Sequence, residues 1–153
     1  MKKFIINILI PILVGGISAL ITKNSMYIYS YLDKPSFAPP SILFPIVWTI
    51  LYLIMGVSSY LICNSDNSNK KCAYIIYGIQ LFLNFIWSIV FFLLSYRLLS
   101  FIIIILLLIS IIIMIIKFYK IDKKAGLLQI PYLLWVLFAS ILNLSIYLLN
   151  RVK

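Results

Sequence analysis

The sequence contains neither histidine nor glutamate, and it has few carboxylates and thiols. Its acidic residues are Asp33, Asp66 and Asp122, and its thiols are Cys63 and Cys72. Without histidine, neither a Ser-His-Asp nor a Cys-His catalytic set can form. No metal site is expected, because the aspartates are scattered and a zinc site needs three or four clustered ligands. Only 5 glycines are present, and they form no glycine-rich phosphate loop. These absences exclude hydrolases, kinases and metalloenzymes of the soluble type.

Apolar residues dominate the rest of the chain. They make up 65% of its 153 residues, charged residues make up 10%, and the mean hydropathy is +1.16. Typical soluble domains are about 45–50% apolar, and a small domain keeps much of its surface wet. The composition therefore indicates an integral membrane protein. The net charge of +10 does not indicate nucleic acid binding, because the basic residues lie in the breaks between apolar runs, where they face lipid headgroups.

Five apolar runs approach the ~20 residues that a helix needs to cross a bilayer. They cover about residues 4–22, 44–62, 73–95, 98–116 and 125–149. They do not alternate apolar with polar residues, as the strands of a membrane barrel do. The predicted fold is all-α, a single five-helix transmembrane domain over residues 1–153. A secretory signal peptide is the alternative for the first run, but Pro11 in its middle and the lack of a clear cleavage site favour a retained span.

The lysines and arginines predict an orientation. With five spans, one side carries eight lysines, namely Lys2, Lys3, Lys70, Lys71, Lys117, Lys120, Lys123 and Lys124. The other side carries five basic residues, namely Lys23, Lys34, Arg97, Arg151 and Lys153. The positive-inside rule then places the N-terminus in the cytoplasm and the C-terminus outside. Cys63 and Cys72 fall on the cytoplasmic side, where reduced thiols are expected.

Three runs carry polar and aromatic residues at helical spacing, each on one face. The stripes are Trp48, Tyr52 and Met55; Tyr77, Gln80, Asn84, Trp87 and Phe91; and Tyr132, Trp135, Ala139, Asn143 and Tyr147. Polar side chains in hydrocarbon turn toward the bundle interior, so we expect an aromatic cavity inside the bundle. The alternative is plain helix packing, with the tryptophans in an interfacial belt.

The break before the second run holds Pro35, Pro39 and Pro40, which exclude a helix interior and favour an extended, semi-rigid loop. Such a loop is either a lid or a connector. No ionisable residue lies deep in any run. This argues against a proton-driven antiporter and against acid–base catalysis in the membrane.

Three segments together resemble the translocator protein family, also called tryptophan-rich sensory protein, TspO/MBR or peripheral-type benzodiazepine receptor. They are KPSFAPP (34–40) followed by FPIVWTILYLIMG (44–56), QLFLNFIWS (80–88) and PYLLWVLFASILN (131–143), and they occur in the family's order. The resemblance implies a five-helix bundle, usually dimeric, with a ligand pocket beneath the first loop. The pocket positions carry over to Pro39, Trp48, Asn84, Trp87, Trp135 and Ala139.

The resemblance also implies a function. Family members bind porphyrins, notably metal-free protoporphyrin IX, and some bacterial relatives promote its light-dependent breakdown, which is tied to the tryptophans matching Trp48 and Trp135. We therefore expect a receptor or sensor for a tetrapyrrole in a bacterial cell membrane, needing no cofactor. The alternatives are a photochemical porphyrin degrader, a transporter of porphyrin or other hydrophobic molecules, and a structural protein without a small ligand. The sequence departs from the family by lacking an acidic residue near Ile103 and a tryptophan in the first loop.

A homodimer is also expected from the resemblance. Gly15 and Ala19 are four residues apart in the first run, and such a small-residue pair is typical of closely packed membrane helices. The pair can serve packing within the chain or between two copies.

Overall fold

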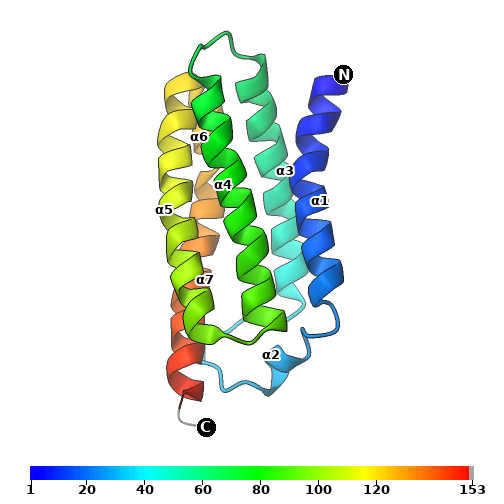
Figure 1. The fold of residues 1–153 in the computed structure, drawn as a ribbon, viewed down its shortest axis with the longest axis vertical. Helices are drawn as coiled ribbons and strands as arrows, with labels where there is room; N and C mark the ends of the chain where they lie inside the picture. Colours follow the sequence, from blue (N-terminus) through cyan, green and yellow to red (C-terminus); the bar gives the residue numbers. More distant parts are fainter. Residues whose placement is uncertain (152–153) are drawn as a thin grey trace.

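The computed structural model describes residues 1–151, which form helices and no strand (Figure 1). Five segments within this range are long and apolar enough to cross a membrane, as predicted. They are α1 (Lys2–Thr22), α3 (Leu43–Asn64), α4 (Lys70–Ser88) with the π-helix η1 (Ile89–Leu93), α5 (Arg97–Ile121), and α6 (Lys123–Leu127) with α7 (Ile130–Asn150). The short helix α2 (Ile28–Tyr31) lies in the first long connection. The protein is an integral membrane bundle.

The helix boundaries differ from the predicted runs where polar residues continue or end a helix. The third segment stops at Leu93 rather than at residue 95, and Ser95 follows with a left-handed φ of 59°. The fourth runs on to Ile121 through Lys117 and Lys120, since long lysine side chains can carry their charge from an apolar helix to the membrane surface. The fifth is divided between α6 and α7, and Pro131 lies in the first turn of α7, where proline is tolerated.

Helix α1 packs on the bundle mainly through α3. The two backbones come close at Gly56, where an added Cβ would lie 2.7 Å from the Cα of Ile8. One turn further along, the Ser59 hydroxyl donates to Asn7 Oδ1 at 2.6 Å. This contact makes the first apolar run part of the bundle. Helices α4 and α5 pack side by side, and α7 packs behind α5 (Figure 1).

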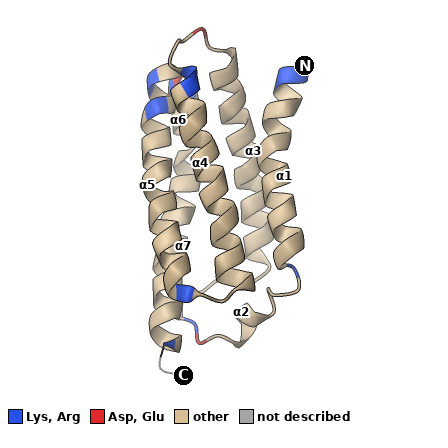
Figure 2. Cartoon of the chain, in the orientation of Figure 1, with Lys and Arg blue, Asp and Glu red and all other residues tan. Residues whose placement is uncertain are grey.

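The two termini lie at opposite ends of the bundle, as an odd number of spans demands (Figure 1). The N-terminus shares its end with the loop between α3 and α4 and with the turn between α5 and α6. The C-terminal end carries α2 and the connection that leads into α3. Lysines gather at the N-terminal end, over α1, α5 and α6 (Figure 2). Lys153 lies outside the described residues. The side of the membrane on which each end lies stays a prediction.

Candidate functional site

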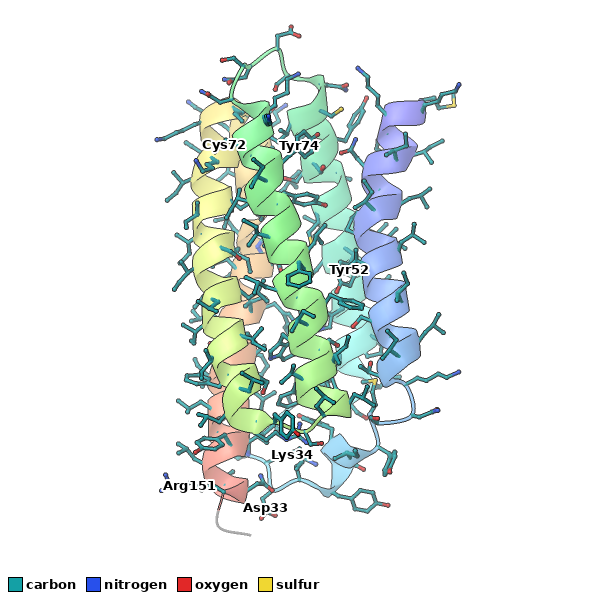
Figure 3. The ribbon with its side chains drawn as sticks, viewed as in Figure 1. Asp33, Lys34, Tyr52, Cys72, Tyr74 and Arg151 are labelled. Atoms are coloured by element: carbon teal, nitrogen blue, oxygen red, sulfur yellow. The ribbon has the colours of Figure 1, made fainter. Side chains whose placement is uncertain are left out.

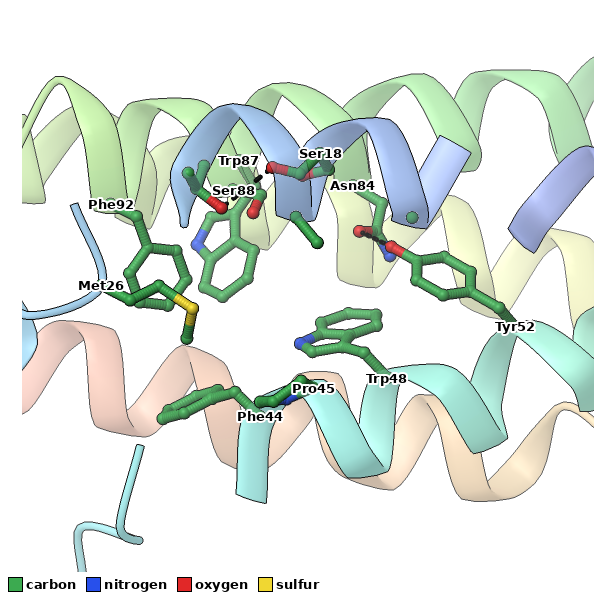
Figure 4. Close-up of a pocket in the computed structure, with 13 residues that line it drawn as sticks. Ser18, Met26, Phe44, Pro45, Trp48, Tyr52, Asn84, Trp87, Ser88 and Phe92 are labelled. Atoms are coloured by element: carbon green, nitrogen blue, oxygen red, sulfur yellow. Dashed lines mark hydrogen bonds between the residues drawn. The ribbon is translucent and has the colours of Figure 1, made fainter. Parts of the chain in front are cut away.

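A cavity of about 70 Å³ lies between α1, α3, α4 and η1, in the half of the bundle nearer the C-terminal end (Figure 4). We call it the aromatic cavity. Its lining residues are Gly15, Ser18, Ala19, Thr22, Met26, Phe44, Pro45, Trp48, Tyr52, Asn84, Trp87, Ser88 and Phe92. Five of these residues are aromatic, and the indole of Trp48 lies across the cavity from that of Trp87 (Figure 4).

Trp48 is the centre of a network of rings. It stacks on Tyr52 at a centroid distance of 5.6 Å and meets Trp87 at 6.1 Å. It also meets Tyr132 of α7 edge-on at 6.1 Å. Trp87 in turn stacks on Phe91 at 5.5 Å. Helices α3, α4 and α7 therefore contribute rings to a single aromatic cluster, held in the offset and edge-to-face arrangements that such rings prefer.

Trp135 joins the same cluster through the ring of Phe44, which also lines the cavity. Its indole lies 6.2 Å from the ring of Phe44 and 5.5 Å from that of Phe138. Trp135 is half-buried and does not itself line the aromatic cavity. All 3 tryptophans of the chain thus belong to one cluster, with Trp48 and Trp87 on the cavity wall and Trp135 behind Phe44.

A chain of buried hydrogen bonds fixes the polar part of the wall. Tyr52 donates to Asn84 Oδ1 at 3.0 Å, and Asn84 Nδ2 donates to the Tyr132 hydroxyl at 2.9 Å. Tyr132 donates onward to Gln80 Oε1 at 2.8 Å. Nearby, Trp87 Nε1 donates to Asn143 Oδ1 at 3.1 Å. These bonds join α3, α4 and α7 and hold the rings of Tyr52 and Trp87 in place beside the cavity.

Three buried polar groups in this region have no partner among the described residues. They are the Ser18 hydroxyl, which belongs to the cavity lining, the Gln80 side-chain nitrogen and the Trp135 indole N–H. Most buried polar groups in proteins are hydrogen-bonded. An unpartnered hydroxyl at the edge of a cavity can therefore accept or donate a bond to a molecule inside it.

The first long connection covers the C-terminal end of the bundle. Tyr29 donates to the Pro39 carbonyl at 3.1 Å, and burial raises the pKa of Tyr29 to about 12, so its hydroxyl stays protonated at physiological pH. Phe37 meets Phe138 of α7 at 6.2 Å. Asn150 Nδ2 donates to the Asp33 carbonyl at 2.9 Å, near the bottom of the bundle, where Asp33 and Lys34 project (Figure 3). The connection is thus fastened to α7 at Phe37 and Asp33, and the bond from Tyr29 of α2 to Pro39 joins two parts of the connection itself.

The structure brings together part of the predicted site. Trp48, Asn84 and Trp87 line the aromatic cavity. Pro39 lies in the connecting loop, and Ala139 is buried in the core of α7, so neither lines it. The predicted stripes are nevertheless directed inward, and Gln80, Asn84 and Asn143 are each no more than 1% exposed.

Sequence reasoning missed the contribution of α1. Gly15, Ser18 and Thr22 line the cavity, and the Gly15 backbone leaves no room for a Cβ beside the Tyr52 ring. Their spacing of three and four residues places them on one helical face, which is the signal that could have identified them. Of the small-residue pair that predicted close packing, Gly15 packs within the chain against the Tyr52 ring, whereas Ala19 is exposed. At Ile103, where the family usually has an acid, the apolar side chain packs on the core.

Comparison with known proteins shows the wider relationship. A profile of the TspO/MBR family matches residues 7–149. The chain belongs to the TspO/MBR family. It is 40% identical over 149 residues to the tryptophan-rich protein TspO of Archaeoglobus fulgidus, covering 97% of each chain. It is 38% identical to the protein of the same name from Chlorobaculum tepidum, covering 87% of this chain and 85% of that one. It is also 30% identical to the translocator protein of Bos taurus, covering 95% and 88%. The chain is therefore a membrane protein of this family of sensors and translocators.

Proposed function

We propose that the protein is a membrane receptor or sensor that binds a flat aromatic tetrapyrrole, of the protoporphyrin IX type, in the aromatic cavity. The observation that carries the proposal is the contact of Trp48 and Trp87 on the wall of a cavity inside the bundle. Trp and Phe faces stack on flat aromatic rings. The Ser18 hydroxyl adds a free polar group at the edge of the cavity, which suits the polar substituents of such a ligand.

Binding requires the cavity to enlarge. Pockets for drug-sized ligands are roughly 300–1,000 Å³, whereas the aromatic cavity holds about 70 Å³. Met26 and Phe44 lie toward the connecting loop at one end of it (Figure 4). Release of the loop contacts at Pro39 and Asp33 would free this end. The loop then acts as the lid that its prolines suggest.

The side chains present favour a metal-free macrocycle over haem. The chain has no histidine, and its two thiols lie on α3 and α4 near the lysine-rich end, away from the cavity lining. Axial ligation of haem iron in proteins uses histidine, cysteine, methionine or tyrosine. Met26 and Tyr52 of the lining remain, but methionine ligates haem iron together with histidine, which the chain lacks, and Tyr52 is already engaged by Asn84 and by the Trp48 ring. Stacking, rather than ligation, is the interaction that this wall offers.

Titration of the detergent-solubilised protein with protoporphyrin IX, followed by tryptophan fluorescence, tests the proposal. An aromatic pair contributes ~0.5–1.5 kcal/mol beyond area burial. Trp48→Ala and Trp87→Ala remove burial as well, so each should weaken binding about tenfold or more. Trp135→Ala should weaken binding through Phe44, because the two rings are in contact. Ile112→Ala is the control on an exposed face, and it should change affinity by less than about twofold. Equal losses for Ile112→Ala and Trp48→Ala would overturn the proposal.

Light-dependent breakdown of the bound porphyrin is the second candidate function. Two sets of ring contacts support it. Trp48 on the cavity wall contacts Tyr52 and Trp87, and Phe44, which also lines the cavity, contacts Trp135. Trp48→Phe and Trp135→Phe preserve a ring and should keep most of the affinity. If the indoles take part in the photochemistry, both variants lose the light-dependent decay of porphyrin absorbance. Unchanged decay in both would assign the protein to binding alone.

We also propose that the protein is a homodimer. The support is the family membership. Gly15 is unavailable for this contact, because it packs against Tyr52 within the chain. Crosslinking at a low ratio of protein to detergent should yield a dimer, and a purely monomeric product would count against it.

A further inference from the structure

A second open space lies at the lysine-rich end of the bundle, far from the aromatic cavity. This headgroup groove, of about 420 Å³, lies where the loop before α4 meets the last turns of α5, and its lining residues are Asn67, Asn69, Cys72, Ile113, Ile116, Lys117, Lys120 and Ile121. Cys72 marks its place in Figure 3, at the top of α4 beside α5. It is several times larger than the aromatic cavity and needs no movement to admit a ligand.

The groove has an apolar part and a cationic part. Ile113 and Ile116 of α5 are 39% and 50% exposed, and they line the apolar part of the groove, on the side nearer the middle of the helix. Lys117 and Lys120 follow directly on the same helix, nearer its end. A molecule that fits both parts must have a long apolar portion and an anionic head. An anionic glycerophospholipid has this arrangement.

The two lysines are available for such a head. Within the described residues, neither Lys117 nor Lys120 forms an ion pair or a side-chain hydrogen bond. The nearby acids form no ion pair with them: neither Asp122 nor Asp66 lines the groove, the Asp122 carboxylate caps α6 by accepting from Ala125 N at 3.0 Å, and Asp66 is exposed. The side-chain amides of Asn67 and Asn69 add hydrogen-bond donors at the same end.

A groove at the opposite end makes a useful contrast. It too is lined by basic and apolar side chains, among them Arg97, Arg151 and Ile102. However, the Arg97 guanidinium donates to the Phe91 carbonyl and lies 4.6 Å from the centre of the Phe91 ring. Its charge is therefore already engaged by its own chain. Arg151 is then the one basic side chain of that groove without such a contact among the described residues, whereas the headgroup groove has two, Lys117 and Lys120.

We infer that the headgroup groove is a specific binding site for an anionic membrane phospholipid, with its phosphate between Lys117 and Lys120 and an acyl chain along Ile113 and Ile116. The inference does not depend on the ligand of the aromatic cavity, nor on which leaflet the lysine-rich end faces. Basic residues near a membrane surface attract anionic lipids, and the groove adds a shape that would hold one lipid molecule.

Native mass spectrometry of the delipidated full chain tests the site, with phosphatidylglycerol and phosphatidylcholine of identical acyl chains as probes. Lys117→Gln/Lys120→Gln should lower the preference for phosphatidylglycerol about thirtyfold, which corresponds to about 1 kcal/mol per lysine. The matched control is Lys2→Gln/Lys3→Gln, which removes the same charge from α1 at the same end of the bundle. The control should change the preference by less than about twofold.

A second pair of variants tests the groove rather than the charge. Ile116→Trp should fill the apolar part and displace the lipid, whereas Ile109→Trp, at an equally exposed position outside the lining, should not. The inference is overturned if the wild-type protein shows no preference for phosphatidylglycerol. It is equally overturned if the two lysine pairs have equal effects, because the attraction would then be a property of the whole charged end.

Discussion

At the scale of single residues, Asn84 is the junction of the candidate site. Its side chain is 1% exposed, accepts from Tyr52 and donates to Tyr132, and so joins three helices through one amide. Both tyrosines also contact the Trp48 ring. Because a buried polar group is costly when unpaired, Asn84 helps to decide where these rings lie. It therefore couples the stability of the bundle to the shape of the cavity.

Asn84→Leu should destabilise the protein and weaken ligand binding. The substitution keeps a similar volume but leaves the Tyr52 hydroxyl without its acceptor. Hydrogen bonds between membrane helices average about 0.6 kcal/mol and reach about 1.7 kcal/mol, so we expect a loss near the upper figure, since two bonds are removed. Reversible unfolding in mixed detergent micelles measures it. The double variant with Tyr52→Phe should lose less than the sum of the two single changes, and strict additivity would contradict the coupling.

At the scale of elements, the end of the third span determines which rings reach the cavity. The α-helix widens into η1 after Ser88, and Val90, Phe91 and Phe92 are then buried in succession. A regular α-helix turns one of three consecutive residues away from a given face. The π-helical turn instead lets Phe91 stack on Trp87 while Phe92 lines the cavity. Such turns are frequently found at functional sites.

Two glycines give predictions of opposite sign, Gly56 at the contact between α1 and α3 and Gly78 on α4. Gly56→Ala places a Cβ 2.7 Å from the Ile8 backbone, so α1 must move away, and such overpacking costs about 1–3 kcal/mol. Gly78→Ala meets nothing within 4 Å and should gain up to about 1 kcal/mol of helix stability. Thermal unfolding of the two variants measures both effects.

Because α1 forms one wall of the aromatic cavity, Gly56→Ala should also weaken porphyrin binding, whereas Gly78→Ala should not. Equal stability of the two variants would show that the approach of α1 to α3 is not tight.

At the scale of the whole molecule, the distribution of charge predicts how the bundle sits in the membrane. Eight lysines share the end that carries the N-terminus, and four described basic residues lie at the other end (Figure 2). Positive residues are retained on the cytoplasmic side during insertion. We therefore propose a cytoplasmic N-terminus, with the proline-rich loop and the entrance to the aromatic cavity on the outer side.

A reporter fused to the C-terminus tests this orientation. A fluorescent protein that matures only in the cytoplasm should stay dark there, and an enzyme that requires export should be active. Fusion of the same reporters to the N-terminus is the matched control and should give the opposite pattern. Strong cytoplasmic fluorescence from the C-terminal fusion would contradict the proposed orientation.

The sequence by itself determined that the chain has five segments long and apolar enough to cross a membrane and that the stripes containing Gln80, Asn84 and Asn143 face inward. Both follow from local chemistry. A helix needs about 20 apolar residues to cross the hydrocarbon of a bilayer, and a polar group left unpaired in that hydrocarbon is costly. Only the tertiary structure decided which stripes enclose the cavity. Ser18 and Thr22 line it because α1 packs against α3 at Gly56, and Trp135 lies behind Phe44 because of how α7 is placed. Such contacts depend on which helices are neighbours and how they are placed against one another, whereas helical spacing within a single segment indicates only which of its residues share a face.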